Sequence, residues 1–203
     1  MPNLISLLPI PFIWGPLGGG DSTPRHFWEG MGWRGRWQEN FRNFARWLAE
    51  HDPFVRITAR KAVIGLSGTQ ATSSRLRYLG VERVESFPYH VAINQREFDF
   101  LSTLQGPDCA GIRFISLGRM IPWKGLHLAL RAFALAKLKD AEFFLVGDGP
   151  DRRRLEVLAE RLGISTSVKF HGDLSRGEAW QQLEQCHVLI HPCLRGREKQ
   201  ALE

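Results

Sequence analysis

The sequence predicts an α/β protein whose C-terminal half forms an open, doubly wound parallel sheet. Between residues 112 and 191, short apolar runs alternate with segments of helical spacing in the order β-α-β-α-β-α-β. Strands joined by helices run parallel with right-handed crossovers, and runs that are apolar on both faces are typical of strands covered on both sides. The composition, 43% hydrophobic and 24% charged, excludes a disordered, collagen-like or coiled-coil chain.

The spacing of apolar residues predicts each element of this half in turn. Four short apolar runs predict strands over Ile112–Leu117, Glu142–Val146, Val168–Phe170 and His187–His191. Three segments with apolar residues on one helical face predict helices over Trp123–Lys139, Arg152–Leu162 and Ser175–Gln185. The first half is less regular, and we expect about three strands there. Gly106–Gly111 is rich in turn residues and predicts a linker.

Ligands of such sheets bind beyond the carboxyl ends of the strands, so the residues that follow each strand are the candidate site. After the first strand, Gly118, Arg119 and Lys124 combine a glycine with a guanidinium and an ammonium. These groups suit a diphosphate, because Arg and Lys supply donors and charge while glycine allows close backbone approach. The alternative is that Arg119 and Lys124 are solvated surface cations. The dinucleotide and P-loop motifs do not follow any strand.

Several segments together resemble one known family. They are Ser116–Gly125, Val146–Arg154, Leu162–Gly163, Val168–Gly172 and Val188–Pro192 in the second half, and Phe12–Asp21, Lys61–Ser67, Gly80 and Arg83–Asn94 in the first half. The chain resembles the family-4 (group 1) retaining glycosyltransferases, which have the GT-B architecture of two facing Rossmann-like domains. The resemblance implies a partial acceptor-side domain over residues 1–107 and a partial nucleotide-sugar-binding domain over residues 111–203.

The resemblance also implies an activity and a set of site residues. The expected reaction transfers a sugar from a nucleotide-diphosphate donor to a saccharide or lipid-linked acceptor, with retention of configuration and without a cofactor or metal. Arg119 and Lys124 match the pair that stabilises the leaving diphosphate, a role that fixed cations in a dry cleft perform well. Further donor-binding positions match Gly118, Gly147, Asp148, Gly149, His171 and Gly172. A strand-end imidazole without a ligand is the other interpretation of His171.

The chain departs from the family pattern near its end. The family carries two glutamates about eight residues apart after the fourth strand; Glu203 matches the second, and Arg195 stands at the first. Glu198 is too close to Glu203 unless the loop differs. Two full domains need roughly 350 residues or more, so the 203 residues suggest a fragment lacking parts of both ends. The alternative function is a catalytically inactive GT-B-like remnant or interaction module.

One segment of the first half has chemistry of its own. Trp33, Trp37, Phe41, Phe44 and Leu48 fall at helical spacing with Trp47 beside them, and Arg34, Arg36, Arg42 and Arg46 are interleaved. A basic helix with an aromatic face can lie in a membrane interface and meet anionic headgroups. The other interpretation is an aromatic core stripe with a solvated arginine face.

Charge and cysteine content bear on partners and compartment. The formal net charge is +6, which permits an anionic partner, but no nucleic-acid-binding motif occurs, so we expect no nucleic acid. Cys109, Cys186 and Cys193 have neither metal-ligand spacing nor an even number, which favours a reducing compartment. We therefore expect a cytoplasmic protein, with peripheral contact to the inner face of the membrane if residues 33–48 bind lipid.

Overall fold

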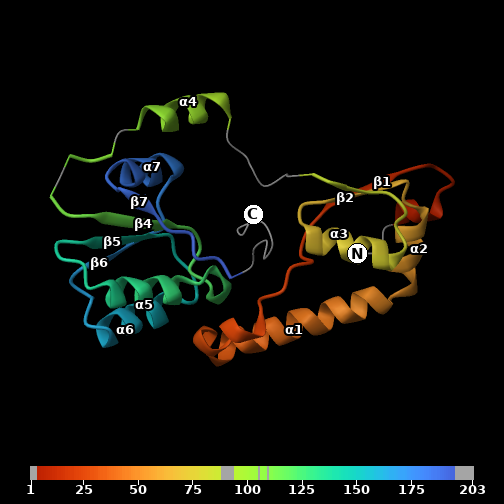
Figure 1. The fold of residues 1–203 in the computed structure, drawn as a ribbon. Helices are drawn as coiled ribbons and strands as arrows, with labels where there is room; N and C mark the ends of the chain where they lie inside the picture. Colours follow the sequence, from red (N-terminus) through yellow and green to blue (C-terminus); the bar gives the residue numbers. More distant parts are fainter. Residues whose placement is uncertain (1–3, 88–93, 105, 109, 195–203) are drawn as a thin grey trace. The chain divides into compact units, whose positions relative to one another are not determined.

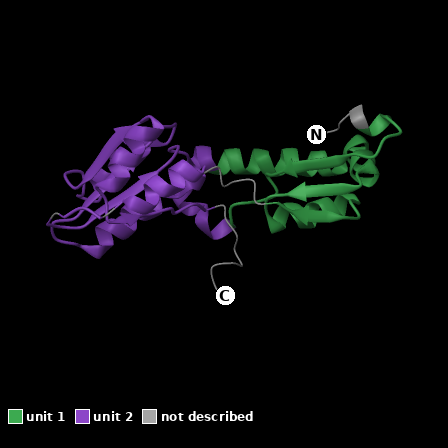
Figure 2. Cartoon of the chain, turned by 90° about the horizontal axis from the view of Figure 1, so that it is seen from above, with its two compact units in different colours: residues 1–24, 36–93, 195–203 green, residues 25–35, 94–194 purple. Residues whose placement is uncertain are grey.

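The computed structural model describes residues 4–87, 94–104, 106–108 and 110–194. Two compact units make up the chain (Figures 1 and 2). Unit 1 comprises residues 1–24, 36–93 and 195–203, and unit 2 comprises residues 25–35 and 94–194. The limits of the units therefore differ from the linker predicted at Gly106–Gly111, while the functional domains expected over 1–107 and 111–203 stay a prediction.

Unit 2 contains a parallel four-stranded sheet with the order β6-β5-β4-β7. Its strands are β4 (Arg113–Leu117), β5 (Glu142–Val146), β6 (Val168–Gly172) and β7 (Val188–Leu189). All three neighbouring pairs are parallel, which confirms the α/β class and the parallel order predicted from the sequence. The fourth strand is shorter than predicted, since only Val188 and Leu189 pair with β4.

Side chains of β5 alternate between two hydrophobic clusters, one on each face of the sheet. Phe143 and Leu145 are buried in the cluster that also holds Leu130 and Leu155, whereas Phe144 and Val146 belong to the cluster on the other face. Successive residues of a strand point to opposite faces, so burial of both sets shows that both faces are covered. This explains the continuous apolar run EFFLV.

The three helices predicted for the second half are present in unit 2, with one correction. They are α5 (Leu126–Ala136), α6 (Arg152–Arg161) and α7 (Arg176–Glu184). The unit also contains α4 (Gln95–Thr103) and the short helices η2 (Arg25–Phe27) and η3 (Glu29–Met31), which were not predicted, and η4 (Pro122–Lys124). The predicted helix Trp123–Lys139 is too long. Gly125 adopts a left-handed conformation between η4 and α5, and Lys137 does so after α5, so the helical hydrogen bonds break at both points.

Residues 25–35 belong to unit 2 because they pack against α5 and α6. The Arg154 guanidinium donates to the Gly30 carbonyl at 2.7 Å and pairs with both carboxylate oxygens of Asp151. A Cβ at Gly30 would lie 2.4 Å from Nε2 of His127, so the Gly30 backbone lies directly on that imidazole. The close approach requires a residue without a side chain at position 30.

Unit 1 has a three-stranded parallel sheet in the order β1-β2-β3. Its elements are η1 (Leu4–Leu7), β1 (Ile13–Leu17), α2 (Pro53–Lys61), β2 (Ile64–Ser67), α3 (Gln70–Leu79) and β3 (Val84–Ser86), and most of α1 (Gly32–His51). Trp14 packs with Val55, Ala59 and Leu76 in the core of this unit. The three strands expected in the first half are therefore present.

The long helix α1 has its polar face turned inward. Glu39 is fully buried and accepts hydrogen bonds from the Thr23 amide at 3.0 Å and from Arg42 at 2.8 Å. Arg42 and Arg46 also donate to the carbonyls of Asp21 and Gly20. The opposite face exposes large side chains, listed with their exposed fractions: Trp37 64%, Phe41 59%, Phe44 59%, Trp47 53% and Leu48 57%. We call these five residues the α1 stripe.

The α1 stripe contradicts one of the two sequence interpretations of this segment. An aromatic core stripe with a solvated arginine face requires the aromatic residues to be buried and Arg42 and Arg46 to be free. The structure has the reverse, because the carbonyls of residues 20 and 21 attract the guanidinium groups to the inner side of α1. Trp33, at the first turn of α1, is also exposed, at 74%.

Candidate functional site

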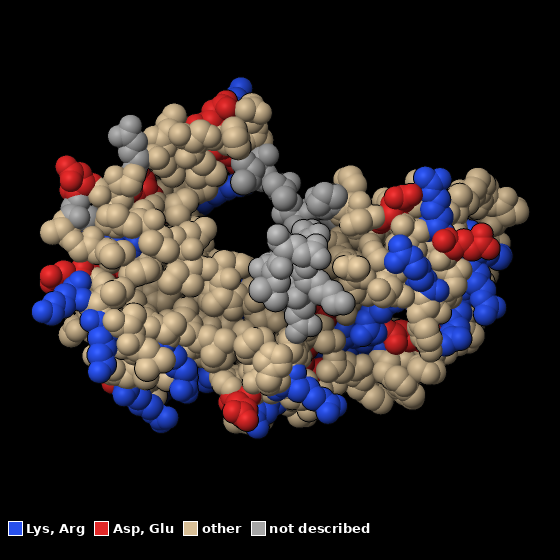
Figure 3. Space-filling model, viewed as in Figure 1, with Lys and Arg blue, Asp and Glu red and all other residues tan. Residues whose placement is uncertain are grey.

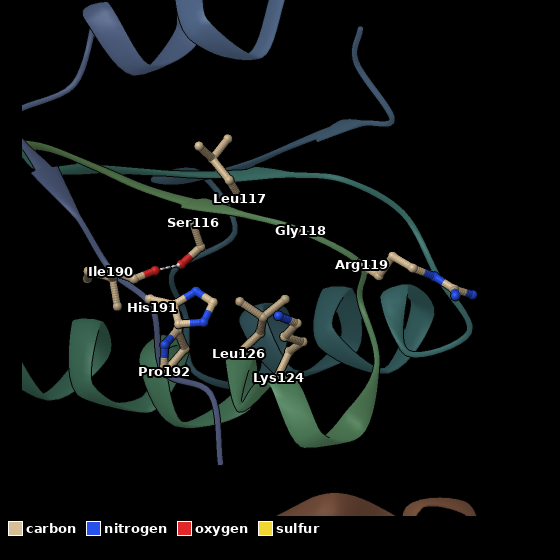
Figure 4. A pocket seen from close by; sticks show the side chains of 9 residues that line it. All are labelled: Ser116, Leu117, Gly118, Arg119, Lys124, Leu126, Ile190, His191 and Pro192. Carbon is tan, nitrogen blue, oxygen red and sulfur yellow. Dashed lines mark hydrogen bonds between the residues drawn. The ribbon is translucent and has the colours of Figure 1, made fainter. Parts of the chain in front are cut away.

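A pocket lies at the carboxyl ends of β4 and β7 in unit 2. Its lining consists of Ser116, Leu117, Gly118, Arg119, Lys124, Leu126, Ile190, His191 and Pro192 (Figure 4). The chain passes from β4 to β5 to β6 on one side of β4 and then returns to place β7 on its other side. The strand order therefore reverses at the neighbouring strands β4 and β7. Open α/β sheets bind ligands beyond the carboxyl ends of the strands at such a reversal.

The pocket is small and partly open. Its empty volume is about 210 Å³, open solvent included. Sites that enclose a drug-sized ligand measure about 300–1,000 Å³, so this hollow does not enclose a whole ligand of that size. Leu126 and Ile190 supply apolar surface, while Lys124 and His191 supply polar groups.

Lys124 is positioned by the short helix η4 and by the chain that follows β7. Its amide donates to the Ile121 carbonyl at 2.9 Å, and the Leu194 amide donates to the Trp123 carbonyl at 2.9 Å. Figure 4 shows the Lys124 side chain running toward His191, whereas the Arg119 side chain extends away from both. The structure therefore brings Lys124 and Gly118 to the pocket as predicted, and it places Arg119 at the edge with its guanidinium turned outward.

The glycine-rich loop after β5 lies beside the loop after β4. The Gly118 amide donates to the Val146 carbonyl at 2.9 Å, and the Met120 amide donates to the Asp148 carbonyl at 2.8 Å. A Cβ at Gly147 would lie 2.2 Å from the Gly118 carbonyl oxygen, so position 147 requires glycine. These contacts join the two predicted loops into one surface at the edge of the sheet, although the loop after β5 does not line the pocket itself.

Asp148 holds its own loop in place rather than facing an open cavity. Its carboxylate accepts from the Gly149 amide at 2.6 Å and from Arg152 at 2.9 Å. These hydrogen bonds, that from Gly149 first, lower the pKa of Asp148. The carboxylate is therefore ionised at neutral pH and stabilises the turn that begins α6.

His171 and Gly172 lie at the end of β6, two strands away from β4. The Gly147 amide donates to the Gly172 carbonyl at 2.7 Å, so Gly172 continues the loop surface. The His171 ring packs edge-on against Phe144, with 5.1 Å between ring centroids, and burial lowers the pKa of His171. Its Nε2 has no hydrogen-bond partner among the described residues. His171 does not line the pocket, and Glu203, Arg195 and Glu198 lie outside the described residues.

Two polar residues of the pocket lining were missed by reasoning from the sequence. Ser116 donates through Oγ to the Ile190 carbonyl at 2.6 Å and so ties β4 to the end of β7. His191 follows Ile190 directly and faces the pocket (Figure 4). Neither residue is recognisable without the sheet order, because nothing in the sequence places the fourth strand next to the first.

Basic side chains of unit 2 gather along the edge formed by α5 and α6 (Figure 3). Several are paired within α6: Arg152 with Asp148 and Glu156, and Arg154 with Asp151. This part of the positive charge is therefore balanced locally. Among the residues that the structure describes, no group of three or more His, Cys, Asp or Glu could hold a metal ion.

Residues 109–202 match the sequence model of one protein family, described as glycosyl transferases group 1. This part of the chain is therefore similar to the group 1 glycosyl transferases. The matched region, which we call the group 1 domain, contains β4 to β7 and every pocket residue.

A curated relative of the same kind is the lipopolysaccharide core biosynthesis glycosyltransferase LpsD of Rhizobium meliloti (strain 1021). It is 32% identical over 89 residues, which cover 40% of this chain and 25% of LpsD. The chain thus spans about a quarter of the length of LpsD, and the next relative has a similar share.

Two solved structures show the same fold. HepE of Anabaena, solved in complex with UDP, has a TM-score of 0.53 at 20% identity and is matched over 71% of this chain and 43% of its own. WaaG, a glycosyltransferase involved in lipopolysaccharide biosynthesis, has a TM-score of 0.50 at 17% identity, over 94% of this chain and 55% of its own. The architecture is that of GT-B glycosyltransferases. None of the helices in the described ranges is long and apolar enough to cross a membrane.

Proposed function

We propose that this protein takes part in the transfer of a sugar from a nucleotide-diphosphate donor to a saccharide or lipid-linked acceptor. The observation that supports it is the pocket between the ends of β4 and β7, which contains Lys124 and Gly118 within the group 1 domain. HepE, a structural neighbour, binds UDP and UDP-glucose, which supports a nucleotide-sugar as the donor.

In the proposed reaction, the bond between the sugar C1 and the diphosphate oxygen breaks, and the electron pair leaves with the diphosphate. The acceptor hydroxyl oxygen forms the new bond to C1 and gives up its proton to an oxygen of the departing diphosphate. Lys124 stabilises the charge that builds up on the leaving group, because a fixed cation in a partly desolvated site lowers the energy of a developing anion. Arg119 joins it when its side chain turns inward. Retention of configuration follows from the family resemblance.

LpsD and WaaG are glycosyltransferases of lipopolysaccharide biosynthesis, which supports a lipid-linked saccharide as acceptor. The alternative function is a remnant that binds the donor without transferring its sugar. Binding with turnover supports the enzyme, and binding without turnover in the presence of lipid-linked and free saccharides supports the remnant.

Calorimetric titration of the full chain with UDP-glucose, GDP-mannose and ADP-glucose tests the donor site. We expect one of these to bind, and Lys124→Ala to weaken it at least about tenfold, since a hydrogen bond to a charged group contributes about 1.5–3 kcal/mol. Lys139→Ala is the matched control, because Lys139 is exposed and outside the pocket lining. Equal affinity of the Lys124→Ala and Lys139→Ala variants would refute the phosphate site.

A second proposal concerns where the protein acts. We propose that the α1 stripe contacts an anionic membrane surface from the cytoplasmic side. Trp and Phe dominate the stripe, Arg36 beside it is exposed, and the acidic Glu39 of the same helix is buried. Aromatic residues with cationic neighbours are typical of helices in the membrane interface.

Co-sedimentation of the full chain with vesicles of rising phosphatidylglycerol content tests this contact. We expect bound protein to increase with anionic lipid and to fall when Trp37→Ala and Trp47→Ala are combined. The control combines Phe54→Ala and Phe98→Ala, two exposed aromatic residues outside α1. Binding that ignores lipid charge, or that both double variants reduce equally, contradicts the proposal.

A further inference from the structure

His191 is a polar residue of the pocket to which the proposed donor site assigns no role. It follows Ile190 at the end of β7, lines the pocket with Lys124 and is accessible to solvent. Figure 4 shows its ring on the β7 side of the pocket, near the side chains of Leu126 and Lys124. An imidazole beside an ammonium at the strand-order reversal of an α/β sheet stands where an anionic ligand is expected.

The backbone on both sides of His191 is fixed. On one side, Ile190 donates through its amide to the Ile115 carbonyl at 2.8 Å and accepts from Ser116 Oγ at 2.6 Å. On the other side, the Leu194 amide donates to the Trp123 carbonyl at 2.9 Å, one residue before Lys124. These contacts hold the His191 backbone relative to both β4 and η4, so His191 and Lys124 extend from one fixed backbone frame.

We propose that His191 is a further anion-binding residue of this site, whose imidazole contacts the same diphosphate as the Lys124 ammonium. The inference rests on the proposed donor site and adds a second, titratable contact to it. A ring N–H donates to a phosphate oxygen in the neutral imidazole, and the protonated ring adds a positive charge to that contact.

The charges around His191 predict a proton linkage. The charged groups that line the pocket with it are the cations Lys124 and Arg119, and no carboxylate belongs to the described lining. In the ligand-free site, partial burial and then the Lys124 charge lower the pKa of His191. A bound diphosphate reverses the local potential and raises that pKa, so binding takes up a proton.

The sign of the linkage follows. The pKa of His191 is higher with the diphosphate bound than without it. The extra affinity that protonation gives is therefore fully present at pH values below the pKa of the ligand-free protein. It is lost as the pH rises through the pKa of the complex. Each pKa unit gained on binding changes affinity about tenfold between the two limits.

The test is calorimetry of the full chain with the nucleotide-sugar that binds among UDP-glucose, GDP-mannose and ADP-glucose. A diphosphate esterified at both ends does not titrate between pH 5 and 8, so proton uptake then reports on the protein. Titrations at about pH 6 in two buffers of different ionisation enthalpy count the protons. We expect net uptake and several-fold weaker binding at pH 8 than at pH 5.5.

Three variants separate the contributions. His191→Gln keeps a neutral hydrogen-bonding group, so we expect it to retain most of the affinity at pH 8 but to lose proton uptake and pH dependence. His191→Ala removes the contact and weakens binding about threefold to tenfold also at pH 8. His26→Gln, at an exposed histidine outside the pocket, leaves all three measurements unchanged.

The outcomes distinguish this inference from the function on which it rests. Nucleotide-sugar binding that depends on Lys124 but keeps its proton uptake in His191→Gln overturns the role of His191 and leaves the donor site intact. Failure of the unchanged protein to bind any of the three nucleotide-sugars overturns both.

Discussion

Replacement of Gly125 by alanine tests whether the pocket wall depends on a close backbone approach. Gly125 has φ +71°, and a Cβ there would lie 1.9 Å from the carbonyl oxygen of Pro192, which lines the pocket. Since real Cβ atoms essentially never approach within 3.0 Å of another heavy atom, that carbonyl must move by at least about 1.1 Å. The displaced groups are the chain neighbours of Lys124 and His191, since Lys124 precedes Gly125 and His191 precedes Pro192.

Gly163 provides a matched control within the same unit. It also has φ +71°, but nothing lies within 4 Å of a Cβ built on it. Gly163→Ala therefore carries only the cost of a left-handed conformation, about 1–2 kcal/mol. Gly125→Ala adds a steric cost of about 1–3 kcal/mol, as for overpacking in a filled site.

Two measurements separate strain from displacement. The free energy of unfolding comes from urea titration, with hydrogen exchange of the β5 amides reporting on unit 2. Donor affinity comes from calorimetry, and we expect Gly125→Ala to lose about tenfold to a hundredfold, since a misplacement near 1 Å is costly in a binding site. Gly163→Ala keeps its affinity. Equal losses of stability and affinity in both variants would show that the Pro192 carbonyl does not shape the pocket.

Two further predictions concern buried polar groups. His127 is 1% exposed, and its burial, followed by the charge of Arg154, lowers its pKa to about 4. Between pH 6.5 and 4 the unfolded chain therefore binds more protons than the folded one. Unit 2 then loses up to about 3 kcal/mol of stability as the pH falls through this range. His127→Leu removes this slope in urea titrations at several pH values, and an unchanged slope contradicts the assignment. Glu39→Ala leaves the Thr23 amide and Arg42 without their carboxylate, and we expect a loss of about 2–3 kcal/mol in unit 1. Its comparison is Glu85→Ala, whose exposed pair with Arg83 contributes at most about 1 kcal/mol; equal effects would mean that the Glu39 contacts are not formed.

Local spacing predicted most elements of unit 2 well, because each strand and helix is short and apolar at regular intervals. The strand Glu142–Val146 has the predicted limits, and α6 and α7 begin at or one residue after the predicted start. Helix ends were less predictable where the cause is a backbone conformation rather than a pattern. The left-handed turns at Gly125 and Lys137, which shorten α5, are of this kind.

For the candidate site, the sequence identified residues but not their directions. Lys124 and Gly118 were expected at the mouth of the sheet and lie there. Arg119 lies at the same place with its guanidinium turned outward, and His191 was not foreseen (Figure 4). Side-chain direction depends on neighbours brought in by the fold, and motif spacing carries no information about it.

The sequence by itself determined the α/β class, the parallel order of elements and the family resemblance, because these depend on residues close together in the chain. Only the tertiary structure decided that β7 returns to the free side of β4, which creates the pocket and brings His191 to Lys124. It also decided which face of α1 is buried. Helical spacing makes α1 amphipathic in either case, but the carbonyls of residues 20 and 21 hold Arg42 and Arg46 inward and leave the aromatic side chains outside. Both outcomes depend on contacts between distant segments.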